Sequence, residues 1–192
     1  MAKGSLGGLV ITVSGPHGTG KSTYAKALAQ AFKLRYISAG ELFRDLAKQQ
    51  KLSLGELSSR AAEDPSIDRM LDERTKAEAK KGGVVIDAQL AAWMVKEIAN
   101  VRVLLTASDD VRFKRIAQRD QVKLEDARRE TEYRESIQQK RYMKYYGIDV
   151  HNLAIYDLTV DTSLHTIEET KRIVLESVRD VLVRQGKLKG AG

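Results

Sequence analysis

The sequence predicts an α/β protein: a three-layer α/β/α domain around a five-stranded parallel sheet. Two observations predict this fold. Short β-branched apolar runs alternate with helical stretches, and the first of these runs leads directly into a glycine-rich loop followed by a helix. The chain has 192 residues, of which 42% are hydrophobic, so it can bury the core of one such domain. We therefore expect a single domain over residues 1–192.

The expected strands are short apolar runs bounded by glycine or polar residues. Residues 9–13, Leu-Val-Ile-Thr-Val, are typical of a strand that is buried on both faces. The other expected strands cover residues 35–37, 84–87, 101–105 and 154–159. Because helical sequence lies between the strands, we expect them to run parallel.

The expected helices connect these strands. The first follows the glycine-rich loop and ends near Phe32, and a long helical region over 40–81 is broken at 52–53 and 64–65. Trp93 lies on a short apolar helix and is expected to pack in the core. Later helices are expected over 109–120, over 124–146, and over a last segment that carries Ile167, Val174, Val178 and Val181 on one face.

Charge and composition narrow the classes of function. Lys and Arg number 33 against 26 Asp and Glu, and the net charge of +7 favours an anionic partner, either a nucleotide, a nucleic acid or a membrane surface. The sequence has no cysteine, which excludes disulfides, iron–sulfur clusters, thiolate zinc sites and cysteine nucleophiles. Its apolar runs are far shorter than a membrane span, and its first residues lack the apolar region of a signal peptide. We therefore expect a cytoplasmic protein without a membrane partner.

Residues 15–22, Gly-Pro-His-Gly-Thr-Gly-Lys-Ser, match the phosphate-loop pattern G-x-x-x-x-G-K-[ST] between a strand and a helix. Glycines let the backbone fold tightly around an oxyanion, and the following helix adds its positive N-terminal end. Lys21 would place its charge between the β- and γ-phosphates, and the Ser22 hydroxyl is a suitable oxygen ligand for Mg²⁺. The expected site for a nucleoside triphosphate such as ATP comprises Gly15, Pro16, His17, Gly18, Thr19, Gly20, Lys21, Ser22 and Thr23.

Arginines recur at helical spacing after the fourth strand. Arg112, Arg115 and Arg119 lie within roughly 60° of one another around a helix, with Phe113 and Ile116 beside them and able to face the core. Planar guanidinium groups suit phosphate oxygens, so this face is a candidate wall of a phosphate site.

Two further arginines share a face of the next helix, because Arg134 and Arg141 are seven residues apart. The two helices and the polar turn between them could form a small lid, over about 115–134, that excludes water when it closes. The alternative is a solvated helix with exposed ion pairs, and the candidate pairs are Glu130–Arg134 and Glu125–Arg129.

The order of several short motifs resembles a known family. The segments that carry the resemblance are 15–23, the stretch Ile-Ser-Ala-Gly-Glu-Leu-Phe-Arg at 37–44, Asp-Pro-Ser-Ile-Asp at 64–68, Arg-Tyr at 141–142, Tyr-Tyr-Gly-Ile-Asp at 145–149 and Ile-Tyr-Asp-Leu at 155–158. Together they resemble the archaeal-type cytidylate kinases, a branch of the nucleoside monophosphate (NMP) kinases. The resemblance runs from about residue 9 to residue 181.

This resemblance implies transfer of the γ-phosphoryl group of ATP to CMP or dCMP, with Mg²⁺, in a P-loop kinase fold. It implies a helical NMP-binding insertion over about 38–82 besides the small lid. Ser38 and Arg44 would then meet the acceptor, with Arg44 at its phosphate. Arg115 and Arg119 would lie on the ATP side, and the catalytic residues would be Lys21, Arg134 and Arg141, the two arginines bridging the phosphates.

Asp87 ends the third strand at the carboxyl edge of the sheet, where ligands bind in parallel sheets. It would reach Mg²⁺ through water, orient the acceptor, or act as a structural cap. Because the acceptor phosphate is already mostly ionised at pH 7, no general base is required. Accordingly, His17 is expected to line the loop, and His151 to face solvent.

One position departs from the family pattern. A glycine-arginine pair is expected after the third strand, where this chain has Asp87-Ala88-Gln89-Leu90, so acceptor specificity stays open. Adenylate kinase activity is the near alternative. A nucleic-acid-associated P-loop NTPase and a nucleotide-dependent switch are alternatives of a different class. Positive charge is interleaved with acidic residues, so we expect small nucleotides rather than nucleic acid as partners, and a monomer.

Overall fold

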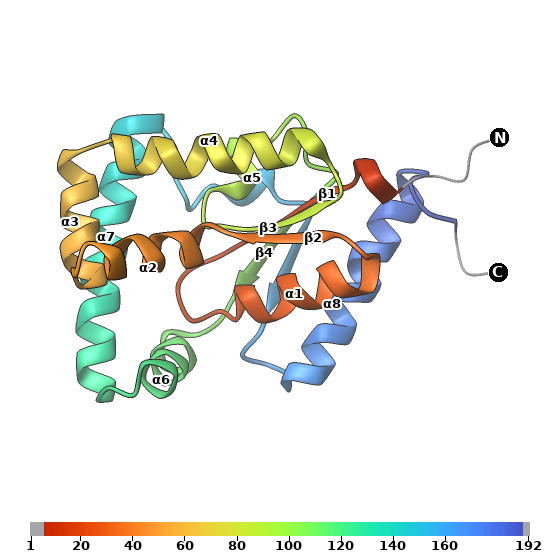
Figure 1. Cartoon of the computed structure of the whole chain (residues 1–192). Helices are drawn as coiled ribbons and strands as arrows, with labels where there is room; N and C mark the ends of the chain where they lie inside the picture. The colour runs from red at the N-terminus through yellow and green to blue at the C-terminus, as the bar shows by residue number, and fades with distance from the viewer. Residues whose placement is uncertain (1–5, 190–192) are drawn as a thin grey trace.

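The computed structural model describes residues 6–189, and its centre is a parallel sheet (Figure 1). The strand order is β2-β3-β1-β4-β5, and every neighbouring pair is parallel. The strands are β1 (Val10–Ser14), β2 (Arg35–Ser38), β3 (Val84–Asp87), β4 (Val101–Thr106) and β5 (Leu158–Asp161). All five residues of β1 are buried, as its β-branched sequence predicts for a central strand.

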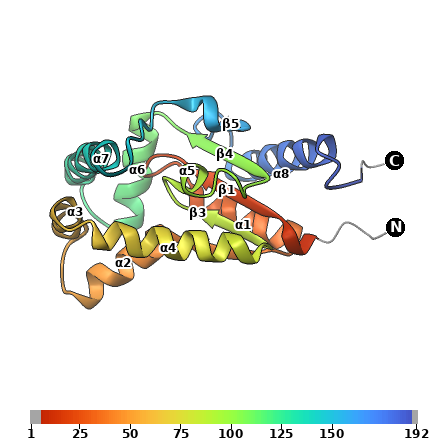
Figure 2. The same cartoon turned by 90° about the horizontal axis from the view of Figure 1, so that it is seen from above.

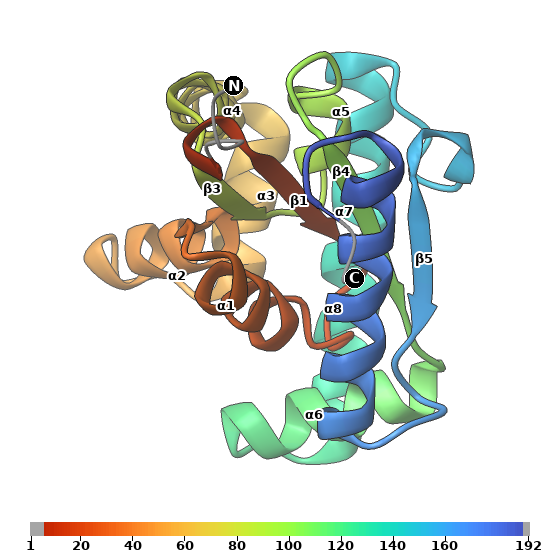
Figure 3. The ribbon, with the colours of Figure 1, turned by 90° about the vertical axis from the view of Figure 1, so that its right-hand side faces the viewer.

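Helices cover both faces of the sheet, so the predicted three-layer architecture is confirmed. The helices are α1 (Lys21–Phe32), α2 (Ala39–Gln49), α3 (Leu54–Glu63), α4 (Ser66–Lys81), α5 (Ala91–Met94), α6 (Asp109–Asp120), α7 (Leu124–Tyr146) and α8 (Ile167–Arg184). Helices α1 and α8 pack on one face, and α4 and α5 on the other (Figure 3). No helix among residues 6–189 is both long and apolar enough to span a membrane.

Four helices gather where the strands end. Figures 1 and 2 show α2, α3, α6 and α7 beyond the carboxyl edge of the sheet, with α3 and α7 side by side. Side-chain caps start two of the helices on the α2–α4 side: Ser38 accepts from the amide of Glu41, and Ser53 forms a capping box with Glu56. Of these two caps, Ser38 is the last residue of β2, so α2 begins directly at the edge of the sheet.

The fifth strand is shorter and later than predicted. Residues Leu153–Ile155 form a 3₁₀ turn, and β5 starts only at Leu158. Asn152 caps the turn, while the carboxylate of Asp157 accepts hydrogen bonds from the backbone and guanidinium of Arg102. The Asn152 cap and the contact between Asp157 and Arg102 hold this stretch ahead of the sheet, and strand pairing begins only at Leu158.

Trp93, which we expected in the core, and Ile167, which we expected on the apolar face of the last helix, are both less buried than their apolar neighbours. Trp93 is only half-buried and packs edge-on against Tyr156, with ring centroids 5.4 Å apart. Ile167 starts α8 with 55% of its surface exposed, while Val174 and Val178 behind it are fully buried as predicted. Both side chains line cavities, which explains why core neighbours do not enclose them fully.

Candidate active site

A large cavity opens at the carboxyl edge of the sheet, between the glycine-rich loop, helices α2 and α4, and helices α6 and α7. It encloses about 1420 Å³, open solvent at its mouth included. Most of the predicted site residues line it: His17, Gly18, Gly20, Lys21, Ser22, Thr23, Ser38, Arg44, Asp87, Arg115, Arg119, Arg134 and Arg141. Gly15 and Pro16 line a second cavity behind the loop, and Thr19 is buried beneath it.

The loop conformation depends on its glycines. Gly15 and Gly18 have φ angles of 144° and 80°, and a Cβ on Gly18 would lie 2.6 Å from the carbonyl oxygen of Arg112. The Nζ of Lys21 folds back and donates to the Pro16 carbonyl at 2.8 Å. Burial lowers the pKa of Lys21 to about 8, so the ammonium is still mostly charged at pH 7. The glycines thus let the loop curve closely enough for the charged Nζ of Lys21 to lie against the loop backbone.

Helix α7 holds the loop from the outside through His17. The backbone N–H of His17 donates to the Glu135 carboxylate at 3.1 Å, and its Nε2 lies 3.0 Å from the Oε1 of Gln138. Burial, with the nearby charges of Arg134 and Lys21, holds the pKa of His17 well below 6.5. The ring is therefore neutral at pH 7 and anchors the loop, in line with the expected non-catalytic role.

The arginines on one face of α6 have two different roles. Arg112 is buried and does not line the cavity. Its guanidinium donates to Glu135, to Asp109 and to the His17 carbonyl, and this joins α6, α7 and the loop. A buried, fully paired guanidinium of this kind fixes geometry rather than meeting a ligand.

Arg115 and Arg119 lie at the loop side of the cavity. Arg115 donates to the hydroxyl and the carbonyl of Thr162 at 2.9 and 2.8 Å, and more weakly to the Gly18 carbonyl. Arg119 pairs with the adjacent Asp120 and stays half exposed. Each guanidinium group thus has a partner, and each also lines the cavity, where it can contact a ligand.

Arg134 is the buried cation without a partner. The exposed pair with Glu130, which was the alternative to a functional role, does not form, and Arg134 makes no hydrogen bond or ion pair among the described residues. Burial lowers its pKa. The other alternative pair is also wrong, because Arg129 pairs with Asp126 rather than with Glu125. An unpaired buried guanidinium is costly, so its position points to an anionic ligand.

Arg141 is already neutralised by an acid. Its Nε lies 2.6 Å from the Oδ2 of Asp68, and its guanidinium donates to the Ser58 carbonyl at 3.1 Å. The Arg141–Asp68 contact lacks hydrogen-bond geometry at both atoms, so each retains capacity for another partner. Burial raises the pKa of Asp68 to about 6, although Arg141 acts in the opposite direction.

Three hydroxyl groups converge on one carboxylate oxygen of Asp87. Ser22, Tyr36 and Ser38 donate to its Oδ2 at 2.6, 3.0 and 3.3 Å. Serine hydroxyl and carboxylate oxygens are suitable ligands for Mg²⁺. In proteins this ion usually keeps several of its waters and also binds the phosphates of a substrate. Within residues 6–189 there is no group of three or more His, Cys, Asp or Glu side chains that could hold a metal ion by itself.

The comparisons with known proteins agree with the geometry. A family model described as an AAA domain matches residues 14–138. The cytidylate kinase of Staphylothermus marinus is 48% identical over 174 residues, which cover 91% of this chain and 98% of the relative. That of Aeropyrum pernix is 50% identical over 167 residues, covering 87% and 97%. This chain belongs to the cytidylate kinase family.

Solved structures extend the likeness to the fold of other small-molecule kinases. A gluconokinase from Sinorhizobium meliloti superposes with a TM-score of 0.63 at 15% identity, over 96% of this chain and 99% of that one. A shikimate kinase from Acinetobacter baumannii has a TM-score of 0.58 at 13% identity, over 90% and 93%. At such low identity these likenesses concern the fold alone, and they confirm the predicted P-loop kinase architecture of this cytidylate kinase family member.

Sequence reasoning missed several residues of the site. Asp68 lies in a recognised motif, but nothing local indicated that its carboxylate would meet Arg141 in the cavity. Gln138 lies four residues after Arg134, so its helical spacing could have placed it on the same face. Gln89, the departure from the cytidylate kinase pattern, accepts a hydrogen bond from the Tyr142 hydroxyl at 3.0 Å instead of supplying charge.

Proposed function

We propose that this protein transfers the γ-phosphoryl group of ATP to CMP or dCMP, giving ADP and CDP or dCDP. The observation that carries the proposal is the single cavity in which Lys21 and the loop face the cations Arg44 and Arg134, in a chain of the cytidylate kinase family. Two polyanions placed end to end need such an arrangement of fixed cations. Because Lys21, Arg44 and Arg134 of the same chain line this cavity together, we propose that a monomer is active.

The donor side of the proposed site is the loop and α6. Backbone N–H groups of the loop and the N-terminus of α1 would hold the ATP phosphates, with Lys21 between the β- and γ-groups. Arg115 and Arg119 would contact the ATP phosphates, and the exposed side chain of Ile167 would contact the adenine base. When bound with ATP, Mg²⁺ neutralises phosphate charge, and we propose that Ser22 and Asp87 hold it, Asp87 through water.

The acceptor side of the proposed site lies between α2, α4 and α7. Arg44 is exposed at the cavity and would pair with the CMP phosphate, near Ser38 at the start of α2. Asp68 would accept a hydrogen bond from the exocyclic amine of cytosine. Because Arg141 is paired with Asp68, we propose that it holds Asp68 in place and donates to the base, rather than bridging the phosphates as the family resemblance implies.

Catalysis in this proposal depends on placement and on charge. Arg134 would bridge the transferred phosphoryl group, since it is buried, unpaired and near the charges of Arg44 and Arg119. The attacking oxygen belongs to a phosphate that is already ionised at neutral pH, so no side chain needs to remove a proton. Positioning in a site shielded from water then favours transfer over hydrolysis.

An assay of ADP release tests the proposal. With ATP and Mg²⁺, we expect ADP release that depends on CMP or dCMP, with AMP, UMP and shikimate turned over at least tenfold more slowly. Equal activity with AMP would favour an adenylate kinase. ADP release that needs nucleic acid instead, and falls steeply with salt, would contradict the proposal.

A further inference from the structure

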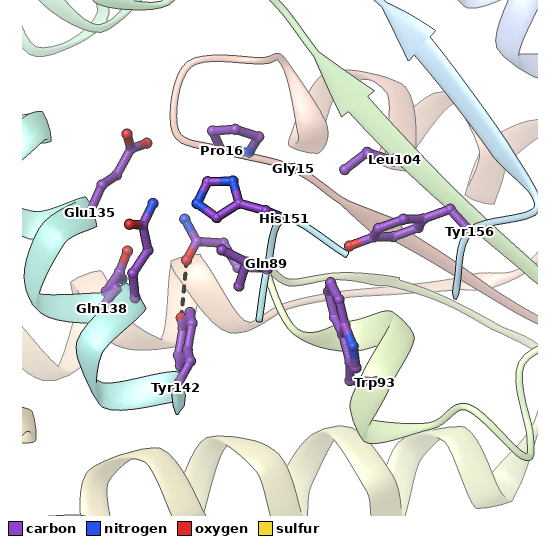
Figure 4. A pocket seen from close by; sticks show the side chains of 12 residues that line it. Gly15, Pro16, Gln89, Trp93, Leu104, Glu135, Gln138, Tyr142, His151 and Tyr156 are labelled. Atoms are coloured by element: carbon purple, nitrogen blue, oxygen red, sulfur yellow. Dashed lines mark hydrogen bonds between the residues drawn. The ribbon is translucent and has the colours of Figure 1, made fainter. Parts of the chain in front are cut away.

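A second cavity lies behind the phosphate loop (Figure 4). It encloses about 560 Å³, open solvent included, between α5, α7, β4 and the segment before β5. By the same measure the main cavity encloses about 1420 Å³, so this second cavity is the smaller of the two. The outer side of the loop, at Pro16, forms one wall, and Trp93 and Tyr156 form the opposite one. The cavity therefore adjoins the main one, with which it shares Gln89, Gln138 and Tyr142, but Lys21 and Ser22 do not line it.

The charge of this cavity differs from that of the first. None of its lining residues, all in the described part of the chain, is a lysine or an arginine. Its acid is Glu135, and both carboxylate oxygens of Glu135 already accept from Arg112. A phosphate placed here would find no cation to offset its desolvation, so the cavity suits an uncharged ligand.

The lining side chains also indicate a flat ligand. Trp93 and Tyr156 meet edge to face at 88°, both half-buried, so ring surface faces the cavity. The amides of Gln89 and Gln139 and the ring of His151 provide donors and acceptors around the rim. Aromatic walls with amides at the edge are the complement of a planar heterocycle with polar edge groups.

We propose that this cavity binds an uncharged nucleobase or nucleoside, and that its occupancy changes nucleotide affinity in the main cavity. Two residues provide the coupling. The carbonyl of Pro16 accepts from Lys21 at 2.8 Å and from Thr19 at 3.0 Å, so a ligand pressed against Pro16 acts on the loop. Gln138 lines both cavities and contacts His17. The proposal does not depend on which monophosphate the enzyme phosphorylates.

The tryptophan provides the measurement, because Trp93 is the only one in the sequence. The main cavity is first saturated with ADP and CMP, a pair that has no phosphoryl group to transfer. Cytosine, adenine, cytidine and adenosine are then titrated, with a free tryptophan derivative as the correction for light absorption. We expect a saturable change in Trp93 fluorescence with at least one of these compounds, and none with inorganic phosphate or benzoate.

Matched variants locate the binding. Leu104→Phe fills the cavity from β4, and Val150→Phe fills it from the turn after α7 in case the first variant fails to fold. Leu188→Phe makes the same change at a position packed on the far core. We expect both cavity variants to abolish the fluorescence change and the control to keep it. Absence of any saturable change, or a change that survives both cavity variants, would overturn the proposal.

The coupling has its own readout. Binding of ADP is measured by calorimetry with and without the compound that bound best, and we expect its Kd to shift by about fivefold or more, which is the range typical of coupled sites. In folded cavity-filled variants this dependence on the second ligand should disappear. An ADP Kd that does not change in the unmodified protein would refute the coupling.

Discussion

The two ends of the main cavity are built in different ways. At the donor end, one continuous segment supplies the glycines, Lys21 and Ser22, so their order in the sequence already places them together. At the acceptor end, Arg44, Asp68 and Arg141 come from α2, α4 and α7 and meet only in the folded protein. The donor end can therefore be common to many kinases with this loop, whereas the acceptor end carries what is particular to this chain.

The largest effect is expected at the donor end. Lys21→Ala removes the charge between the phosphates, and we expect kcat to fall by about 10³-fold or more, as for other charge-stabilising groups in transfer sites. The Nζ contact with the Pro16 carbonyl is local, so the fold should survive. Steady-state kinetics measures the loss, and an unchanged circular dichroism spectrum controls for unfolding. A variant that keeps a tenth of the activity would contradict the assigned role.

The second-largest loss of activity is expected from Arg134, which we place between the donor and acceptor ends of the cavity. Arg134→Ala should lower kcat by about 10²-fold with little change in either KM, because its guanidinium is unpaired until the phosphates are bound. Arg129→Ala on the same helix is the matched control, since its guanidinium pairs with Asp126 on the exposed side. A rise in KM without a fall in kcat, or an equal fall in kcat in the two variants, would show that Arg134 does not act on the transferred phosphoryl group.

A smaller effect is expected at the acceptor phosphate. Arg44→Ala should raise the KM for CMP by about tenfold and leave the KM for ATP nearly unchanged, because Arg44 faces the acceptor side of the cavity. Lys48→Ala, one turn later on α2 and also exposed, provides the control. The assignment is wrong if both Michaelis constants rise together.

The smallest effect concerns the base. Asp68→Asn should lower the ratio of kcat/KM for CMP to kcat/KM for UMP by about tenfold. The amide of Asn can donate to the carbonyl oxygen of uracil, whereas the carboxylate of Asp68 repels that oxygen. In the unmodified protein, affinity for CMP should improve as pH rises through about 6, where Asp68 ionises. Asp72→Asn on the same helix, which bonds Tyr146 outside the cavity, is the control. Unchanged selectivity in the Asp68 variant would exclude it from reading the base.

The same pKa shift makes a prediction for stability. Since the folded-state pKa of Asp68 is raised from 3.8 to about 6, its carboxyl binds a proton more tightly in the folded chain than in the unfolded one. This group therefore stabilises the fold below about pH 4 and loses that contribution as the pH rises to about 6. Urea unfolding at several pH values should show that loss in the unmodified protein and a smaller one in Asp68→Asn.

This contrast also explains what the sequence could predict. Local patterns were sufficient for the loop, for the succession of strands and helices along the chain and for the buried side of α6 at Phe113 and Ile116, because neighbours in sequence decide them. They could not tell whether Arg134 pairs with Glu130 or enters the cavity, since the helix allows both and only packing of α7 decides. The pairing of Asp68 with Arg141 likewise depends on how α4 and α7 approach.

The most direct test of the central claim, that one cavity holds donor and acceptor end to end, uses a single molecule in which adenosine and cytidine are joined by a polyphosphate chain. We predict that it binds one per chain in calorimetry, at least about 10²-fold more tightly than ADP or CMP alone, and competes with both ATP and CMP. Competition with ATP alone, at the affinity of ADP, would contradict the claim.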